Sequence, residues 1–360
     1  MGVTLTEAQW FDLGCRIFRS WGAAEDTAAC VSRSLVQSDL AGISSHGVLR
    51  IPMYHGFVKA GWLKPANRPE VVRESAVTAV IDGQWGFGQP AAELATRLAL
   101  QKARTHGIAS VGLRQAGHIG RLGEYAEMAT REGLIAVIMA SGGPTGGLMA
   151  PYGGAERVLS TNPIGAGVPA RDHDPFVMDY ATSVVAAGKV ELAPDQNAPI
   201  PEGWVVDANG QPARVARQLV EGGALLPFGE HKGYALALLI ELLCGAVTGA
   251  GCTERPDRVI THGLGGNAAF IIAVNPAQFT EEDQFYGAVD GLFDRLKRVK
   301  PAAGFDRVMI PGEPEAQKRR QRQSEGITVA EATWDKILAV AAEGHVILDD
   351  FGQPSQAATR

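Results

Sequence analysis

Hydrophobic residues recur with a helical period near both ends of the chain and in strand-like runs in its middle. Apolar positions three and four residues apart predict helices over Thr6–Ser20 and Ala24–Leu40, and the same period returns from Phe285 to Leu296 and over Val329–Ala342. Short runs rich in Val and Ile and bounded by Gly predict strands at Ala76–Ile81, Ile108–Leu113, Leu134–Ala140 and Ala268–Val274. Amphipathic helices are predicted between these strands, at Pro90–Thr105 and Leu122–Glu132.

This order of elements predicts that helices from both chain ends flank a central sheet. We place a helical domain at residues 1–75 and 300–360 and a sheet-containing domain at residues 76–299. Thr6 and Gln9 have the spacing of a capping box that would start the first helix. The apolar stretch Gly233–Ala250 holds a single charge, Glu241. Because a carboxylate is costly inside a bilayer, we interpret this stretch as a helix buried in a soluble core.

Composition narrows the class of protein. Hydrophobic residues make up 46% and charged residues 20% of the 360 residues, which is typical of folded globular chains and excludes disorder. The net charge of −6 argues against a nucleic-acid partner, which normally needs a basic face. Cys15, Cys30, Cys244 and Cys252 match no zinc or disulfide spacing. Together with the lack of a signal-peptide pattern, this favours reduced thiols in a cytoplasmic protein.

His46 stands in a context that suits acid–base chemistry. Ser45 precedes it directly, and Arg50 follows four residues later. An imidazole can transfer a proton near neutral pH, and a guanidinium can hold a carboxylate with two hydrogen bonds. The alternative is a capping Ser with a surface His beyond a helix end.

Two further histidine sites lie at predicted helix starts. His118 sits in a glycine-rich turn between a predicted strand and a helix, where free backbone N–H groups can bind anions. The alternative is a turn with a half-buried His. His231 and Lys232 open the long apolar helix, so their positive charge lies where the helix dipole is already positive. That arrangement favours a bound anion such as a phosphate.

Several common sites are absent from the sequence. No Gly-x-Gly-x-x-Gly motif follows a predicted strand, and no phosphate-binding loop ending in Gly-Lys-Ser/Thr occurs. Any dinucleotide would therefore bind outside the Rossmann arrangement. Metal-ligand spacings and the Gly-x-Ser-x-Gly setting of a nucleophilic Ser are also missing, so we predict no metal and no Ser nucleophile.

Motifs along nearly the whole chain, from about residue 5 to 345, resemble the malate/L-lactate dehydrogenase family. In order, they are Ser45-His46-Gly47 with Arg50 and Pro52, Gly117–Gly120 with Tyr125 and Ala126, Pro151–Gly154, Ser160–Pro163, Asp179–Ser183 with Gly188 and Lys189, His231–Tyr234, and Pro311–Glu313. The family includes ureidoglycolate and sulfolactate dehydrogenases. The residues within these motifs are most similar to those of its hydroxycarboxylate dehydrogenase B branch.

The resemblance implies an α+β, non-Rossmann dehydrogenase fold. In that fold a largely antiparallel sheet domain binds the nicotinamide cofactor, and both chain ends build a helical domain. It implies hydride transfer between NAD(P)H and a small 2-oxo or 2-hydroxy acid of the malate, lactate or aromatic type. A reductase of cyclic imines (the Δ1-piperideine-2-carboxylate type) on the same fold is the alternative. It also implies a homodimer.

The resemblance further implies which residues form the site. The implied catalytic residues are His46, Ser45, His118 and Lys189, and the implied substrate-binding residues are Arg50 and Thr161. Either His46 or His118 would give the proton. The residues implied to contact the dinucleotide are His46, Gly120, Arg121, Leu122, Asp179, Tyr180, Ala181, Thr182, Ser183, His231, Lys232, Asn267, Gly312, Glu313 and Pro314.

The sequence departs from the usual family pattern around this implied pocket. Gly117, Ser160, Arg121 and the segment 142–148 differ, which leaves the substrate and the choice between NAD and NADP open. Glu313 would repel a 2′-phosphate if it faced the ribose, so we predict a preference for NADH. Arg121 is the alternative, as a partner for the phosphate of NADPH.

Overall fold

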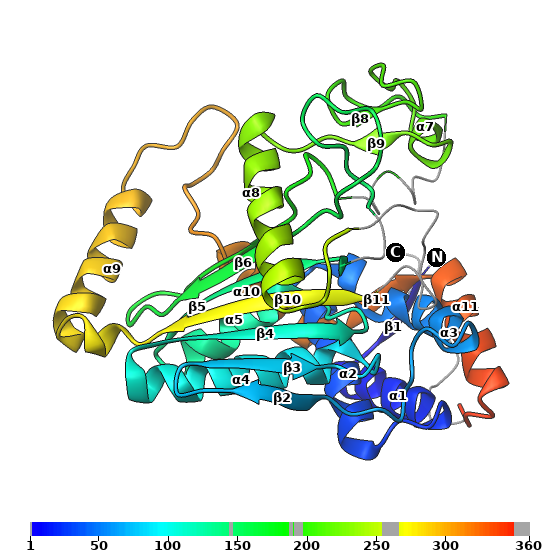
Figure 1. Cartoon of the computed structure of the whole chain (residues 1–360), viewed down its shortest axis with the longest axis horizontal. Helices are drawn as coiled ribbons and strands as arrows, with labels where there is room; N and C mark the ends of the chain where they lie inside the picture. The colour runs from blue at the N-terminus through cyan, green and yellow to red at the C-terminus, as the bar shows by residue number, and fades with distance from the viewer. Residues whose placement is uncertain (1, 144–146, 187–189, 191–196, 254–265, 349–360) are drawn as a thin grey trace, which may run out of the picture.

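The centre of the molecule is a seven-stranded sheet (Figure 1). The computed structural model describes residues 2–143, 147–186, 190, 197–253 and 266–348. Across the sheet, the strands are β2 (Glu70–Glu74), β3 (Thr78–Asp82), β4 (Ile108–Ala116), β10 (Asn267–Val274), β5 (Ile135–Ser141), β6 (Ile164–Val168) and β7 (Phe176–Tyr180). Neighbouring strands are antiparallel except β3 and β4, which are parallel. The predicted α+β fold with a largely antiparallel sheet is confirmed, and the predicted strands correspond to β3, β4, β5 and β10.

Helices cover both faces of this sheet. On one face, α4 (Gly88–His106) and α5 (Leu122–Arg131) pack against β3, β4, β10 and β5. Buried alanines of α4 let its backbone approach the strands closely. On the other face, α8 (His231–Glu241) continues into a π-helical segment, η4 (Leu242–Val247). Ile240 and Cys244 of this helix pack against Met139 of β5 and Ala268 of β10. The sheet is therefore packed between helices on both faces.

The two chain ends meet in a second, helical layer. It contains α1 (Glu7–Ser20), α2 (Glu25–Leu40), α3 (Ile51–Lys59) and α11 (Glu331–Glu343) around a common core. The predicted capping box at Thr6 and Gln9 is confirmed. The predicted helix over Val329–Ala342 is wrong at its start. Strand β11 (Ile327–Ala330) pairs there with β1 (Gly2–Leu5), a strand that the periodicity did not reveal.

The remaining elements lie at the periphery. β8 (Val205–Val206), β9 (Ala224–Leu225) and the short helix α7 (Arg217–Val220) form a small unit beyond α8. η6 (Pro276–Gln278) and α9 (Glu282–Lys297) follow β10, and α10 (Glu313–Glu325) returns to pack on α2. Figure 1 shows α9 at the far edge of the molecule, joined to α10 by an extended segment.

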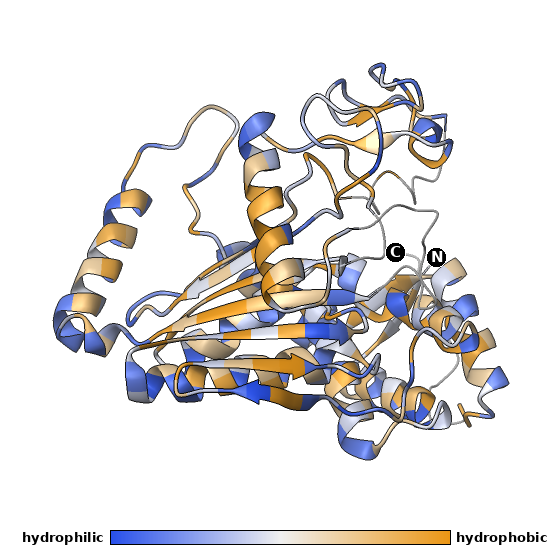
Figure 2. Ribbon diagram, in the orientation of Figure 1, coloured by the Kyte–Doolittle hydropathy of each residue, from blue (hydrophilic) through white to orange (hydrophobic). Residues whose placement is uncertain are grey.

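The structure corrects the prediction that the Gly233–Ala250 helix is buried throughout. Its inner side is buried, but four apolar side chains on its outer side are 38–60% exposed: Leu238, Leu239, Leu242 and Val247. Figure 2 shows how strongly hydrophobic α8 is along most of its length. Among the described residues, no helix has the length and apolar character needed to cross a membrane. The outer face of α8 is thus an apolar surface without a partner in a single chain.

Candidate active site

The turn that carries His46 is held by a buried carboxylate. Asp39, at the end of α2, accepts a hydrogen bond from the Val48 N–H at 2.7 Å. A Cβ atom at Gly47 would lie 2.0 Å from the same carboxylate oxygen, so only Gly allows this close approach. The resulting pair of short 3₁₀ helices, η1 (Ser44–His46) and η2 (Val48–Arg50), places the imidazole and the guanidinium on one compact turn.

Ser45 and Arg50 both form hydrogen bonds within this turn. The Ser45 hydroxyl lies 3.0 Å from Nδ1 of His46, and Arg50 Nε donates to the Ser45 carbonyl oxygen. Burial, together with the charges of Arg50 and Arg121, lowers the pKa of His46 to about 4. His46 is therefore a neutral imidazole in the free protein at neutral pH.

His118 lies directly against His46. The two rings stack with centroids 5.4 Å apart and an interplanar angle of 21°. Tyr54 Oη lies 2.8 Å from His118 Nδ1, and the Gly120 N–H donates to the same nitrogen at 3.3 Å. Burial and the nearby His46 and Arg50 hold the pKa of His118 well below its usual value. The structure thus brings together the two histidines that the sequence singled out separately.

Hydrogen bonds fix the position of three residues implied to bind the dinucleotide: Asn267, Asp179 and Thr182. Asn267 Oδ1 accepts from the Ile119 N–H at 3.0 Å, next to His118. Asp179 Oδ2 accepts from the Gly123 N–H at 2.8 Å, at the start of α5. Thr182 donates to the Thr161 carbonyl oxygen from both its backbone N–H (2.8 Å) and its hydroxyl (2.9 Å). The loop after His118 is therefore bonded to the start of β10, and the start of α5 is bonded to the end of β7.

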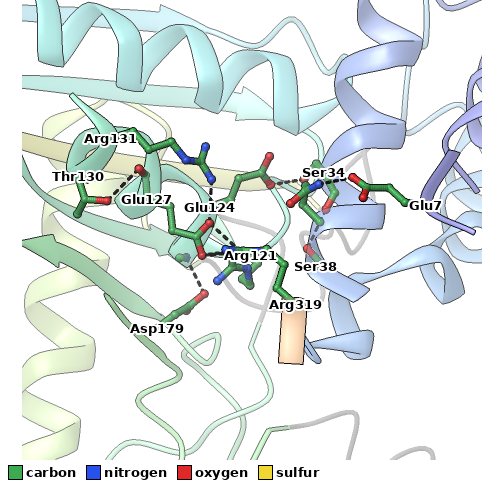
Figure 3. A network of polar contacts seen from close by, with 12 residues as sticks. Glu7, Ser34, Ser38, Arg121, Glu124, Glu127, Thr130, Arg131, Asp179 and Arg319 are labelled. Carbon is green, nitrogen blue, oxygen red and sulfur yellow. Dashed lines mark hydrogen bonds and ion pairs between the residues drawn. The ribbon is translucent and has the colours of Figure 1, made fainter. Parts of the chain in front are cut away.

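Arg121 lies inside a buried network of charges (Figure 3). Its side chain is only 2% exposed and pairs at 2.7 Å with Glu127 of α5. Glu127 also pairs with Arg319 of α10 at 2.9 Å and with Arg131 at 3.2 Å. Burial opposes ionisation of Glu127, but the charges of Arg121 and Arg319 outweigh it and lower the pKa of this carboxyl. Arg121 is thus buried and paired inside the protein, which weakens its case as a partner for a 2′-phosphate.

The carboxylate of Glu313 does not face open space. It pairs with Lys297 of α9 and accepts a hydrogen bond from the Ile310 N–H at 3.0 Å. Burial opposes ionisation, but the ion pair with Lys297 and the Ile310 hydrogen bond lower its pKa. Its charge is therefore compensated, and the argument that Glu313 repels a 2′-phosphate loses its basis. The neighbouring Gly312 and Pro314 lie where α10 begins, and the Pro311 carbonyl oxygen accepts from the N–H of Val177 in β7.

His231 and Lys232 lie at the exposed start of α8, at the end of that helix away from the sheet (Figure 1). The His231 ring contacts Tyr152, with centroids 5.9 Å apart. The Phe228 N–H donates to the Thr182 carbonyl oxygen at 2.9 Å, which connects this helix start to the segment after β7. Lys189 lies outside the described residues.

Sequence reasoning missed an aromatic pocket beside His118. Its apolar lining comes from α3, the segment after it and the approach to α4, and consists of Tyr54, Phe57, Trp62, Leu63, Trp85 and Phe87. Gly117, His118 and Gly266 complete the wall. Tyr54 and Phe57 have the spacing of ordinary core positions on a helix, and only the tertiary structure shows that they face His118.

The glycine-rich loop around residue 120 fits the nicotinamide dinucleotide that the resemblance implies. Within the described part of the chain, Nε of the buried Arg121 has no hydrogen-bond partner, so a donor is available there for an oxygen-rich ligand. The carboxylate of Asp179, which already accepts from the Gly123 N–H at the start of α5, lies close to it. A guanidinium donor suits a phosphate oxygen, and a carboxylate suits a ribose hydroxyl. No group of three or more metal-ligating side chains occurs among the described residues.

Comparison with known proteins places this site in context. The family model of malate/L-lactate dehydrogenase matches residues 6–338. The chain is 34% identical to a malate dehydrogenase of Pyrococcus abyssi, over 94% of each chain. It is also 34% identical to hydroxycarboxylate dehydrogenase B of Escherichia coli K12, over 91% of this chain and 90% of the relative.

The fold agrees with a solved structure of the same kind. Sulfolactate dehydrogenase from Methanocaldococcus jannaschii superposes with a TM-score of 0.87 at 33% identity, covering 97% of this chain and 99% of the other. With a family model that spans most of the sequence and this shared fold, the chain belongs to the malate/L-lactate dehydrogenase family.

Proposed function

We propose that this protein catalyses reversible hydride transfer between a nicotinamide cofactor and the C2 carbon of a small 2-oxo or 2-hydroxy acid. The observation that carries the proposal is the stacked pair of His46 and His118, with Arg50 on the same turn as His46. It supports the proposal because an imidazole can transfer a proton and the guanidinium beside it can bind a carboxylate. The bound nicotinamide would supply or accept the hydride.

In this proposal each residue of the turn has a separate task. Arg50 binds the substrate carboxylate, because its planar guanidinium matches the two oxygens. His46 gives a proton to the ketone oxygen as that oxygen becomes negative, and takes it back in the reverse direction. Ser45 holds Nδ1 of His46, which leaves Nε2 to face the substrate. Lys189 and Thr161 are assigned to the substrate pocket on the family resemblance.

Substrate binding would also favour protonation of His46. The charge of Arg50 is one cause of the low pKa of His46. A carboxylate bound to Arg50 compensates that charge and so raises the pKa of His46 towards neutrality. The 2-oxo acid would then bind together with a proton, and His46 would be charged only when a substrate is in place.

The lining of the pocket beside His118 argues against a second charged group on the substrate. The pocket wall formed by the described residues carries no Lys, Arg, Asp or Glu, and its free volume of about 10 Å³ has room for about one water molecule. A second carboxylate or a sulfonate entering this pocket would lose its hydration without finding a cation there. We therefore place 2-oxo acids with an uncharged side chain above oxaloacetate and sulfopyruvate as substrates.

For the cofactor we propose NAD(H). The residues that would hold it are those gathered around the loop, namely Gly120, Arg121, Leu122, Asp179, Tyr180, Ala181, Thr182, Ser183 and Asn267, with His231 and Lys232 at the start of α8. The support is the branch resemblance and the burial of Arg121, whose guanidinium is already engaged by Glu127.

We also propose that the protein is a homodimer, with the outer face of α8 as part of the contact. Four apolar side chains on this face are 38–60% exposed, and burying them against a second copy would be favourable. Light scattering of the wild type and of Leu239→Glu tests this. The wild type should have twice the mass of the variant, and two equal masses refute the contact.

A substrate screen tests the function as a whole. The protein is mixed with NADH or NADPH and each of phenylpyruvate, 2-oxoisovalerate, pyruvate, oxaloacetate and a cyclic imine carboxylate, and the absorbance at 340 nm is followed. The proposal expects a higher kcat/KM with phenylpyruvate, 2-oxoisovalerate or pyruvate than with oxaloacetate, and a higher kcat/KM with NADH than with NADPH. Turnover of the cyclic imine alone would replace it by the imine-reductase alternative, and a higher kcat/KM with NADPH would overturn the cofactor assignment.

A further inference from the structure

We propose that Tyr54 and Gln89 are positioning residues that hold His118 as the neutral tautomer with its proton on Nε2. In this form His118 donates a hydrogen bond to the substrate, but a neutral imidazole is too weak an acid to transfer that proton, so the proton transfer belongs to His46. The role of His118 towards the substrate rests on the function proposed above. The tautomer itself is a property of the protein alone.

The direction of the hydrogen bonds fixes the tautomer. A backbone N–H can only donate, and the Gly120 N–H points at Nδ1 of His118 at 3.3 Å. Nδ1 must therefore carry a lone pair and no proton. Tyr54 Oη lies 2.8 Å from the same nitrogen, so the hydroxyl donates to it as well. In a neutral imidazole with a bare Nδ1, the proton is on Nε2, on the other side of the ring.

Gln89, in the core, adds a further hydrogen bond behind Tyr54. Its Nε2 donates to Tyr54 Oη at 2.9 Å, which leaves the phenolic hydrogen free to point at His118. Gln89 and Tyr54 are only 1% and 2% exposed. Among the described residues, the Gln89 carbonyl oxygen has no hydrogen-bond partner, although it is buried. The bond to Tyr54 therefore fixes the position of this buried amide.

The packing of α4 explains how Gln89 reaches Tyr54. A Cβ atom at Gly88 would lie 2.1 Å from the Gly117 carbonyl oxygen and 2.5 Å from that of His118. The start of α4 therefore rests directly on the backbone that carries His118, and only Gly permits this contact. The next side chain, Gln89, is thereby directed at the hydroxyl behind the histidine.

The charges around His118 oppose any additional proton. His46 on η1 and Arg50 on η2 face it from one side, and Tyr54 on α3 faces it from the other. Protonation of Nδ1 would break the bonds from Tyr54 and Gly120 and would place a second positive charge beside Arg50. The two stacked rings therefore have different roles. His118 is a hydrogen-bond donor with a fixed tautomer, and His46 is the group that gains and loses a proton.

Nitrogen NMR of the intact protein with ¹⁵N-labelled histidine tests the tautomer directly. The His118 signals are identified by their loss in His118→Asn. We expect an unprotonated Nδ1 and a protonated Nε2 in the wild type, and the appearance of the other tautomer in Tyr54→Phe. The matched control is Tyr125→Phe, because Tyr125 is equally buried and donates to the Ile119 carbonyl oxygen of the same loop without touching His118. It should leave the His118 signals unchanged.

Steady-state kinetics test the consequence for the reaction. Tyr54→Phe should lower kcat roughly tenfold to a hundredfold, the loss expected for one displaced hydrogen bond in the transition state, with little change in the KM for the cofactor. Gln89→Met provides a second variant that keeps Tyr54, and it should move both readouts in the same direction. A wild-type His118 with its proton on Nδ1, or variants that keep both the wild-type tautomer and kcat, would overturn the proposal. If no 2-oxo acid is turned over, the proposed function fails, while the NMR result still decides the tautomer.

Discussion

Replacing Glu127 by Gln removes the carboxylate that three guanidinium groups share. Arg121 is 2% exposed at its side chain and Arg319 is 21% exposed, so both depend on Glu127 to compensate their charge (Figure 3). Arg131 is 63% exposed and remains hydrated without it. The amide of Gln keeps the shape and one acceptor oxygen, so the change is mainly electrostatic.

The expected loss of stability follows from these burials. At an effective dielectric constant of about 20, one pair of charges about 4 Å apart contributes roughly 4 kcal/mol, part of which offsets the desolvation of both groups. Loss of one partner from a buried pair typically costs about 3–5 kcal/mol, because the remaining charge stays buried. The contact with the exposed Arg131 adds about 0–1 kcal/mol. We therefore expect Glu127→Gln to lower the free energy of unfolding by about 3–5 kcal/mol at pH 7.

Urea unfolding followed by circular dichroism measures this difference. The control Arg131→Ala should cost no more than about 1 kcal/mol, and the double variant Glu127→Gln/Arg319→Gln should recover part of the loss by removing one uncompensated cation. The pKa of Glu127 is lowered in the folded state, so its contribution is complete above the unfolded-state pKa. It is lost as the pH falls through the lower folded-state pKa, and wild type and variant should converge there. A cost at pH 7 no larger than that of Arg131→Ala would refute the reasoning.

Three further predictions concern the reaction. His46→Ala should lower kcat on a 2-oxo acid by roughly 10²–10⁴-fold while NADH still binds, measured by its fluorescence; a wild-type kcat would move the proton to another group. Arg50→Lys keeps the charge but loses the planar pair of donors, so kcat/KM for the acid should fall clearly in steady-state assays, and an unchanged value would make Arg50 a structural residue. Because the pKa of His46 is lowered to about 4, kcat/KM for oxidation of a 2-hydroxy acid should decline as the pH falls through about 4, where the base becomes protonated. A profile that instead falls near neutral pH would exclude His46 as that base.

Much of the fold follows from periodicity because most elements bury one face. The α1 helix, with its capping box, and strands β3, β4, β5 and β10 are examples. Strands β1 and β11 could not be predicted in this way, since four residues are too few to establish an alternating pattern. Their pairing, such as that of Thr4 with Thr328, also joins residues 324 positions apart. The outer face of α8 was misread because an apolar run does not distinguish a buried face from an interface.

The candidate site was only partly visible in the sequence for a related reason. His46 and His118 stand out through their neighbours in the chain, yet their stacking joins two loops 72 positions apart. Tyr54 and Gln89 resemble ordinary core residues until the fold turns them towards His118. The compensated charge of Glu313 was equally hidden, because its partner Lys297 lies on a different helix.

The pairing of β1 with β11 has a consequence for how the protein is made. Residues Gly2–Leu5 are synthesised before their partner Ile327–Ala330, which follows 325 residues later. At about 5–20 residues per second, that delay is roughly 16–65 s. During this time the apolar side of α1, with Trp10, Leu13 and Ile17, lacks the cover of α11 and β11. The core shared by these elements is therefore completed only after the strands of the central sheet have been synthesised.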